Sequence, residues 1–170
     1  MLHPWQDPGE EESMSDGRHG KGVVAGIVFL ALIVAAPALG GGVITYEKDI
    51  RPIVAARCAD CHGPDSPSMD EFDRDKERYR KQEKGPRLDT YPHLMVVVKG
   101  ADAGALMRRL DDGKHTKDGK PGNMHDHLGS TDAERAANLE IFRKWVGNWT
   151  LKRKKALSSE ELNAIRAPER

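Results

Sequence analysis

The sequence predicts an all-α domain that follows one apolar N-terminal segment. Three stretches carry apolar residues at helical spacing: Tyr46 to Asp60, Ala101 to Asp111, and Thr131 to about Asn148. The last of them opens with the capping box Thr131-Asp-Ala-Glu134, a pattern that marks a helix N-terminus. Together these helices place the folded domain at residues 46–150.

The first predicted helix ends at a pair of cysteines. Ile50, Ile53 and Val54 share one helix face. Pro52 fits only in the first turn, where its missing N–H has no helical partner. Gly63-Pro64 stops the helix just after the cysteines.

A charged insertion follows at residues 65–87. Between Asp70 and Lys84 nearly every residue is charged, with both signs mixed, and Phe72 and Tyr79 are the only large apolar side chains. Such a mixture predicts a solvated surface helix. A partner-docking arm is the alternative interpretation.

The remaining helices have apolar stripes as well. Leu106, Met107 and Leu110 line the middle helix, and a loop rich in Gly, Lys and Pro runs from Asp112 to Asn123. Beyond the last long helix, residues 151–170 are predicted to form a basic C-terminal tail with a short helix capped by Ser158.

The N-terminal segment concerns localisation. Residues 1–21 are expected to be a disordered cytoplasmic tail, residues 22–39 a transmembrane anchor or signal segment, and residues 40–45 a linker. Basic residues precede the apolar run, so the domain is expected outside the cytoplasm, as a single-pass protein of the cytoplasmic membrane. The alternative is a soluble periplasmic protein after cleavage near Ala38.

Composition narrows the function classes. Lys plus Arg and Asp plus Glu number 27 each, which gives no indication of nucleic-acid binding. Aromatic residues make up only 5%, a small supply of core for 170 residues. A buried prosthetic group would add apolar surface to that core.

The motif Cys58-Ala-Asp-Cys61-His62 predicts covalent attachment of one haem c. Two thiols three residues apart can add to the two vinyl groups, and the next residue, His62, can bind the iron as proximal ligand. A thioredoxin-like pair would begin a helix instead of ending one. A zinc site would need two further ligands.

The distal iron ligand is predicted to be Met124. It lies in an irregular loop that can bring a thioether to the iron without breaking a helix. His125 and His127 are the alternatives and would give a haem of lower potential. The other candidates, Met95 and Met107 in apolar runs, His93 and the loop residue His115, are less favoured.

The run from Tyr46 to Asp65, with Leu88 to Tyr91, Met124 and Trp145, resembles class I monohaem cytochromes c of a bacterial subgroup. The resemblance covers about residues 46–149. It implies a helical fold whose first and last helices pack crosswise beside the haem, and it favours a short helix over Leu88 to Val98. The family methionine is usually followed by Pro, whereas here His125 follows.

These features predict an electron-transfer protein and no enzyme. A haem with both axial positions filled exchanges single electrons at its exposed edge. The expected role is a carrier or a subunit of a respiratory or photosynthetic redox complex, and a gas or peroxide sensor with a displaceable distal ligand is the alternative. No nucleic acid or small-molecule substrate is expected. The predicted docking residues form one basic run: Lys152, Arg153, Lys154 and Lys155.

Overall fold

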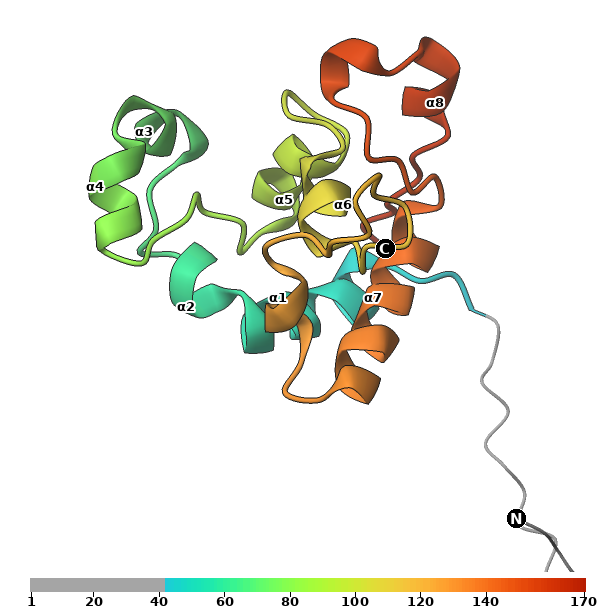
Figure 1. Ribbon diagram of the computed structural model, residues 1–170, viewed down its shortest axis with the longest axis horizontal. Coiled ribbons are helices and arrows are strands. Elements are labelled where there is room, and N and C mark those ends of the chain that lie inside the picture. The colour runs from blue at the N-terminus through green and yellow to red at the C-terminus, as the bar shows by residue number, and fades with distance from the viewer. Residues whose placement is uncertain (1–41) are drawn as a thin grey trace, which may run out of the picture. The chain divides into compact units, whose positions relative to one another are not determined.

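Helices make up the regular structure of the protein, as its computed structural model shows for residues 42–170 (Figure 1). No β-strand occurs among these residues, which confirms the predicted all-α class. In chain order the elements are η1 (Tyr46–Ile50, π-helical), α1 (Arg51–Arg57), α2 (Ala59–His62), α3 (Met69–Arg74), α4 (Lys76–Lys81), α5 (Tyr91–Val98), α6 (Ala105–Leu110), η2 (His125–Leu128, 3₁₀), α7 (Asp132–Val146), η3 (Lys154–Ala156, 3₁₀) and α8 (Ser159–Asn163).

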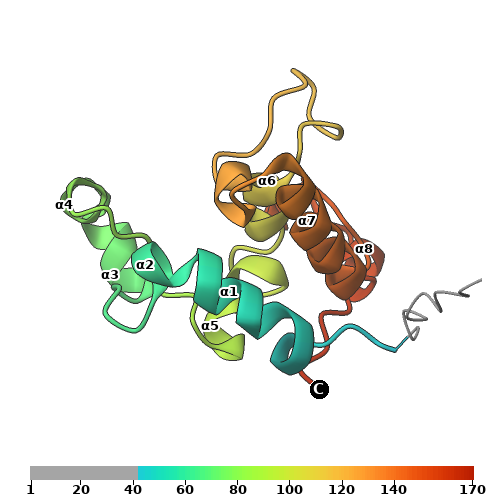
Figure 2. The same ribbon diagram turned by 90° about the horizontal axis from the view of Figure 1, so that it is seen from below.

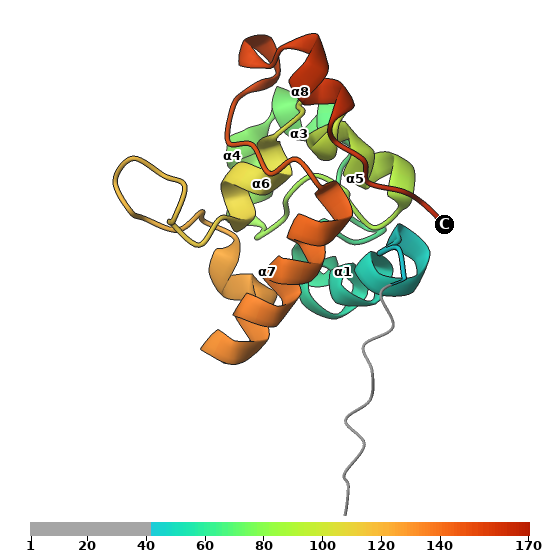
Figure 3. The same cartoon turned by 90° about the vertical axis from the view of Figure 1, so that its right-hand side faces the viewer.

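The N-terminal helix begins where its sequence predicts and is divided into η1, α1 and α2. The Thr45 side chain accepts a hydrogen bond from the Lys48 N–H and caps η1, and Pro52 lies in the first turn of α1. The helix η1, which leads into α1, contacts α7 (Figure 3). This contact brings the first and last long helices together around one core.

Aromatic side chains fill the centre of that core. Tyr46, Phe142 and Trp145 are almost fully buried, and the rings of Tyr46 and Phe142 lie 6.4 and 6.3 Å from that of Trp145. Their polar atoms are satisfied as well: the Tyr46 hydroxyl donates to the Asp89 carbonyl at 3.0 Å, and the Trp145 Nε1–H donates to the Pro168 carbonyl at 2.8 Å. The three aromatic side chains are thus among the largest apolar groups buried in this small domain.

The charged insertion forms two short helices instead of the single expected one. Asp75 interrupts it with φ −146° and ψ 62°, and its side chain accepts from the Arg78 N–H to cap α4. Neither α3 nor α4 contains a buried residue, in keeping with a solvated surface segment. The pair stands away from the rest of the domain, next to α2 (Figures 1 and 2).

The C-terminal residues belong to the folded domain, which corrects the expected boundary at residue 150. Ile165 and Ala167 are fully buried. The Tyr46 N–H donates to the Pro168 carbonyl at 2.9 Å, and the Ala167 N–H donates to the Trp145 carbonyl at 3.0 Å. Residues 151–170 therefore contain the predicted basic stretch and short helix, but they are part of the domain. Their last residues pack against η1 and α7 and complete the core.

The predicted apolar segment, residues 22–39, lies outside the described residues. Across residues 42–170, no helix has both the length and the apolar character needed to cross a membrane. The expected single-pass placement in the cytoplasmic membrane is therefore corrected to this extent: residues 42–170 contain no membrane-spanning helix.

Candidate haem site

The cysteine motif lies at the junction of two helices. Cys58 follows the last residue of α1, and its N–H donates to the Val54 carbonyl. The His62 N–H donates to the Cys58 carbonyl at 2.8 Å and closes the turn of α2. The two thiols are unpaired; Cys58 packs against the core, whereas Cys61 is exposed. The pair therefore presents one thiol on the apolar interior and one at the surface.

Burial keeps the Cys58 sulfur in its neutral form. Desolvation, with a smaller contribution from Cys61, raises the pKa of Cys58 to about 11. Cys58 would therefore meet haem as a thiol, whose S–H could add across a vinyl group to form a thioether.

The ring of His62 is oriented by a main-chain carbonyl. Its Nδ1 lies 2.6 Å from the Pro86 oxygen, a distance at which Nδ1–H donates and Nε2 keeps its lone pair. Burial lowers the pKa of His62; the Pro86 carbonyl opposes this effect, and the positive charges of Arg109 and His127 add to it. His62 is therefore neutral at pH 7 and offers Nε2 as a ligand atom.

The segment that orients His62 follows the insertion. The Gly85 N–H donates to the Cys61 carbonyl at 2.8 Å, and the Leu88 N–H donates to the His62 carbonyl at 2.9 Å. A Cβ on Gly85 would overlap the His62 ring, with its Nδ1 at only 2.6 Å. Gly85 and Pro86 are absent from the residues predicted from the sequence, although a Gly-Pro pair at the end of the insertion is a signal that could have found them.

The loop that carries Met124 is anchored at its base to α6. The Met124 N–H donates to the Arg109 carbonyl at 2.9 Å, and the Gly122 N–H donates to the Asp111 carbonyl at 2.8 Å. Met124 is half-buried against the core, and the η2 helix that follows it contacts α1. The helical turn that directly follows Met124 thus lies against α1, the helix that precedes the cysteine motif.

The other distal candidates have different surroundings. Met107 is fully buried in the core, and His93 Nδ1 lies 2.9 Å from the Thr90 hydroxyl. His125 is half-buried, whereas His127 is exposed. His115 is exposed and its Nδ1 is engaged by Asp111.

An ion pair between Arg57 and Glu134 connects the end of α1 with the start of α7. The guanidinium of Arg57, the residue before Cys58, donates to the Glu134 carboxylate and lies 3.3 Å from the Ser130 hydroxyl. The same carboxylate accepts from the Ser130 N–H at 2.8 Å. The end of α1 is thereby tied to the start of α7, directly after η2.

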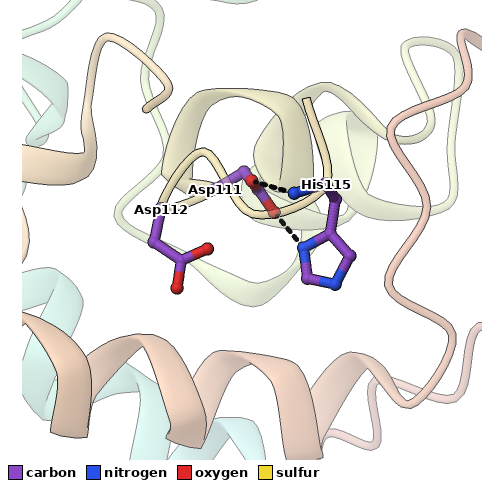
Figure 4. Close-up of side chains that lie close together, drawn as sticks. All are labelled: Asp111, Asp112 and His115. Atoms are coloured by element: carbon purple, nitrogen blue, oxygen red, sulfur yellow. Dashed lines mark hydrogen bonds and ion pairs between the residues drawn. The ribbon is translucent and has the colours of Figure 1, made fainter. Parts of the chain in front are cut away.

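A cluster of Asp111, Asp112 and His115 lies at the start of the loop (Figure 4). Its composition is that of a cation site, but side-chain cations already occupy it. Arg143 Nη2 lies 2.8 Å from the Asp112 carboxylate, and Lys114 Nζ lies 3.0 Å from its other oxygen. The cluster therefore acts as an internal ion-pair network.

Hydrogen bonds affect the pKa values of Asp111 and Asp112 more strongly than burial does. Burial alone would raise the pKa of Asp111, but Trp149 and His115 donate to it and hold that pKa below its usual value. Burial would likewise raise the pKa of Asp112, but Arg143 and Lys114 hold that pKa well below its usual value.

The lowered pKa values predict acid sensitivity. A carboxyl group whose pKa is lower in the folded state stabilises the fold above its unfolded value of about 4, and this contribution is lost as the pH falls toward the folded value. We expect the urea midpoint of the holoprotein to fall from pH 7 to pH 3, and to fall less in Asp112→Asn than in the wild type. Asp118→Asn, at an exposed position of the same loop, is the control. An equal decrease in Asp112→Asn and the wild type would contradict the prediction.

The predicted docking run lies away from the motif. Lys152 to Lys155 precede α8, and the Lys152 carbonyl accepts from Arg108 at the side of α6. In two views α8 and α2 lie at different ends of the domain (Figures 1 and 2).

Helical chains whose first helix ends in Cys-x-x-Cys-His, with the histidine ring hydrogen-bonded through Nδ1, form the class of c-type cytochromes. Residues 45–168 match the family model described as PccH Cytochrome c, so the chain belongs to that family. It is similar to the solved structure of the monoheme cytochrome PccH from Geobacter sulfurreducens, with 51% identity over 75% of this chain and 99% of that one, and a TM-score of 0.71. No curated protein matches the chain.

Membership of this family makes the chain a monohaem cytochrome c with one covalently bound haem. The residues present fit that group, since two unpaired thiols precede a neutral histidine with a free Nε2. The protein is therefore an electron-transfer protein and requires a redox partner, as predicted from the sequence.

Proposed function

We propose that Cys58 and Cys61 form the two thioether links, that His62 Nε2 is the proximal iron ligand and that Met124 is the distal one. The observation that carries this proposal is the 2.6 Å contact between His62 Nδ1 and the Pro86 carbonyl. That bond fixes the tautomer and the ring plane, so that the remaining nitrogen is available in one direction only. Met124 is supported by its half-buried position and by the contact between η2 and α1.

The haem supplies one-electron redox chemistry when bound. The protein keeps the proximal histidine neutral and oriented, and a methionine on the other side would leave no open position for a substrate. Because Cys61 is exposed while Cys58 packs against the core, we propose that electrons cross at the Cys61 side of the domain. The chain would serve there as a carrier between respiratory redox proteins.

The test of the ligand assignment is the visible spectrum of the oxidised protein. We expect the wild type to show the weak long-wavelength band of a thioether–iron bond and Met124→Ala to lack it. We also expect the midpoint potential of the variant to fall, because the thioether favours the reduced state. Met107→Leu replaces a buried methionine of the core and should keep the band. A wild-type spectrum without the band, or a Met124→Ala spectrum that retains it, would rule out Met124.

The basic run from Lys152 to Lys155 remains a proposed docking surface for an acidic partner. It lies near α8, away from α2, so the partner would have to be large enough to contact this run and the Cys61 side together. Reversing all four charges tests it: the salt dependence of electron transfer should change, and an unchanged salt dependence would refute docking at this run.

A further inference from the structure

We propose that Asp111 is a positioning residue for the distal ligand: its buried carboxylate holds the base of the 112–123 loop closed and so keeps Met124 in place. The inference rests on the proposed role of Met124. It assigns a function to the one member of the Asp111–Asp112–His115 cluster that is fully buried.

The loop is closed by main-chain bonds at the end of α6. Asp111 accepts from the Gly122 N–H at 2.8 Å, and Arg109 accepts from the Met124 N–H at 2.9 Å. A Cβ on Gly122 would overlap the carbonyls of Arg108 and Arg109, so the two chain segments run in direct contact. Whatever fixes Asp111 therefore also fixes the backbone two residues before Met124.

The Asp111 carboxylate gathers the first turn of the loop. One oxygen accepts from the Gly113 N–H at 2.9 Å and from the His115 N–H at 3.3 Å. The other oxygen lies 2.9 Å from His115 Nδ1 (Figure 4). Gly113 has φ +90°, and a Cβ there would overlap the Gly119 carbonyl. The first turn of the loop therefore packs tightly against the returning segment around Gly119.

The same carboxylate connects the loop to the C-terminal part of the domain. Trp149 Nε1–H donates to it at 2.8 Å, and Arg143 Nη2 lies 3.5 Å away. Arg143 also pairs with Asp112 at 2.8 Å and lies over the Trp149 ring at 5.4 Å. Asp111 thus joins α6, the loop and α7 through a single buried group.

Asparagine at position 111 would keep the shape and lose the function. Its amide oxygen could still accept from Gly113, but its NH₂ group would face the N–H of Trp149 or the two N–H groups of the loop. Donors would then oppose donors in a fully buried position, which is costly. We expect the loop to open more often, and Met124 to leave its place with it.

The test is the rate at which cyanide takes the distal position of the oxidised holoprotein. Cyanide binds when the methionine is away, so the rate measures loop opening. We expect Asp111→Asn to bind cyanide about tenfold faster than the wild type, while keeping its covalent haem. When the pH is raised, the thioether band of this variant should also disappear at a lower pH than the band of the wild type.

Two controls separate positioning from other effects. Asp118→Asn removes the same charge from an exposed position of the same loop. Tyr91→Phe removes a hydrogen bond to the Ala167 carbonyl, 3.0 Å long and far along the chain from the loop, and so lowers global stability. Both should bind cyanide within about twofold of the wild-type rate, since neither touches the base of the loop. If either matched Asp111→Asn, charge or global stability would explain the effect and the proposal would fail.

Trp149→Phe provides a milder variant should Asp111→Asn fold poorly. It removes one donor from the same carboxylate and should accelerate cyanide binding in the same direction by a smaller factor. A normal thioether band with unchanged cyanide rates in both variants would overturn the role of Asp111 and leave Met124 as the ligand. A wild-type protein without the band would overturn the ligand assignment itself.

Discussion

Replacing both Cys58 and Cys61 by alanine is expected to abolish the covalent haem. The sulfur atoms of these two residues are the only thiols in the sequence, so the double variant has no group left to form a thioether. We expect a complete loss of haem staining after denaturing electrophoresis and a polypeptide of unmodified mass. The loss should also destabilise the fold, because the core is small in aromatic content and the haem contributes apolar surface to it.

The single variants are the matched controls. Cys58→Ala and Cys61→Ala each retain one thiol beside an unchanged His62, and each should keep some covalently attached haem. Because Cys58 packs against the core and Cys61 is exposed, the Cys58 variant should lose more thermal stability. A double variant that still carried haem through denaturation would show that the attachment lies elsewhere.

Gly85→Ala is expected to have the second-largest effect. The added methyl group would overlap the His62 ring, with Nδ1 at 2.6 Å and Nε2 at 2.9 Å from it. The ring is also held by the bond from its Nδ1–H to the Pro86 carbonyl, so a displacement of the ring would strain or break that bond. We expect the yield of holoprotein to fall several-fold, because an overpacked site of this kind costs about 1–3 kcal/mol, and the remaining haem to show a disturbed proximal ligand in its spectrum.

Gly119→Ala is the control for backbone effects. Gly119 has φ +68°, and a Cβ there would meet nothing within 4 Å. The substitution therefore introduces left-handed strain of about 1 kcal/mol without touching the site. If Gly85→Ala and Gly119→Ala reduced the holoprotein equally, steric contact with His62 would not be the cause.

The sequence was most informative where the determinants are local. The cap at Thr131, Pro52 in the first turn of α1 and the cysteine motif each act within a few residues, and each appears in the structure as a helix start or end. Of the predicted capping box only the bond from the Glu134 N–H to the Thr131 hydroxyl forms, because the Glu134 carboxylate accepts from Ser130 instead. The break at Asp75 was missed although it is local, because a mixed-charge run fits one helix as well as two and only the cap at Asp75 decides between them.

The features that the sequence did not predict depend on contacts between residues that are distant in the chain. Pro86 orients a histidine 24 residues earlier in the chain, and Trp149 donates to an aspartate 38 residues before it. The burial of Ile165 and Ala167 depends on main-chain pairing with Tyr46 and Trp145, which no pattern within residues 151–170 indicates. The membrane placement was expected from a segment that lies outside the described residues.

The pairing of Tyr46 with Pro168 has a practical consequence for work with this cytochrome. Because these residues are hydrogen-bonded, the first and last segments of the domain leave it from the same side. The helix α2, which ends in His62, lies toward another end (Figures 1 and 2). A surface tether or a fused protein attached at Arg170 would therefore leave the Cys61 side open to solvent, and an electrode-bound form of the protein could still exchange electrons there with a partner in solution.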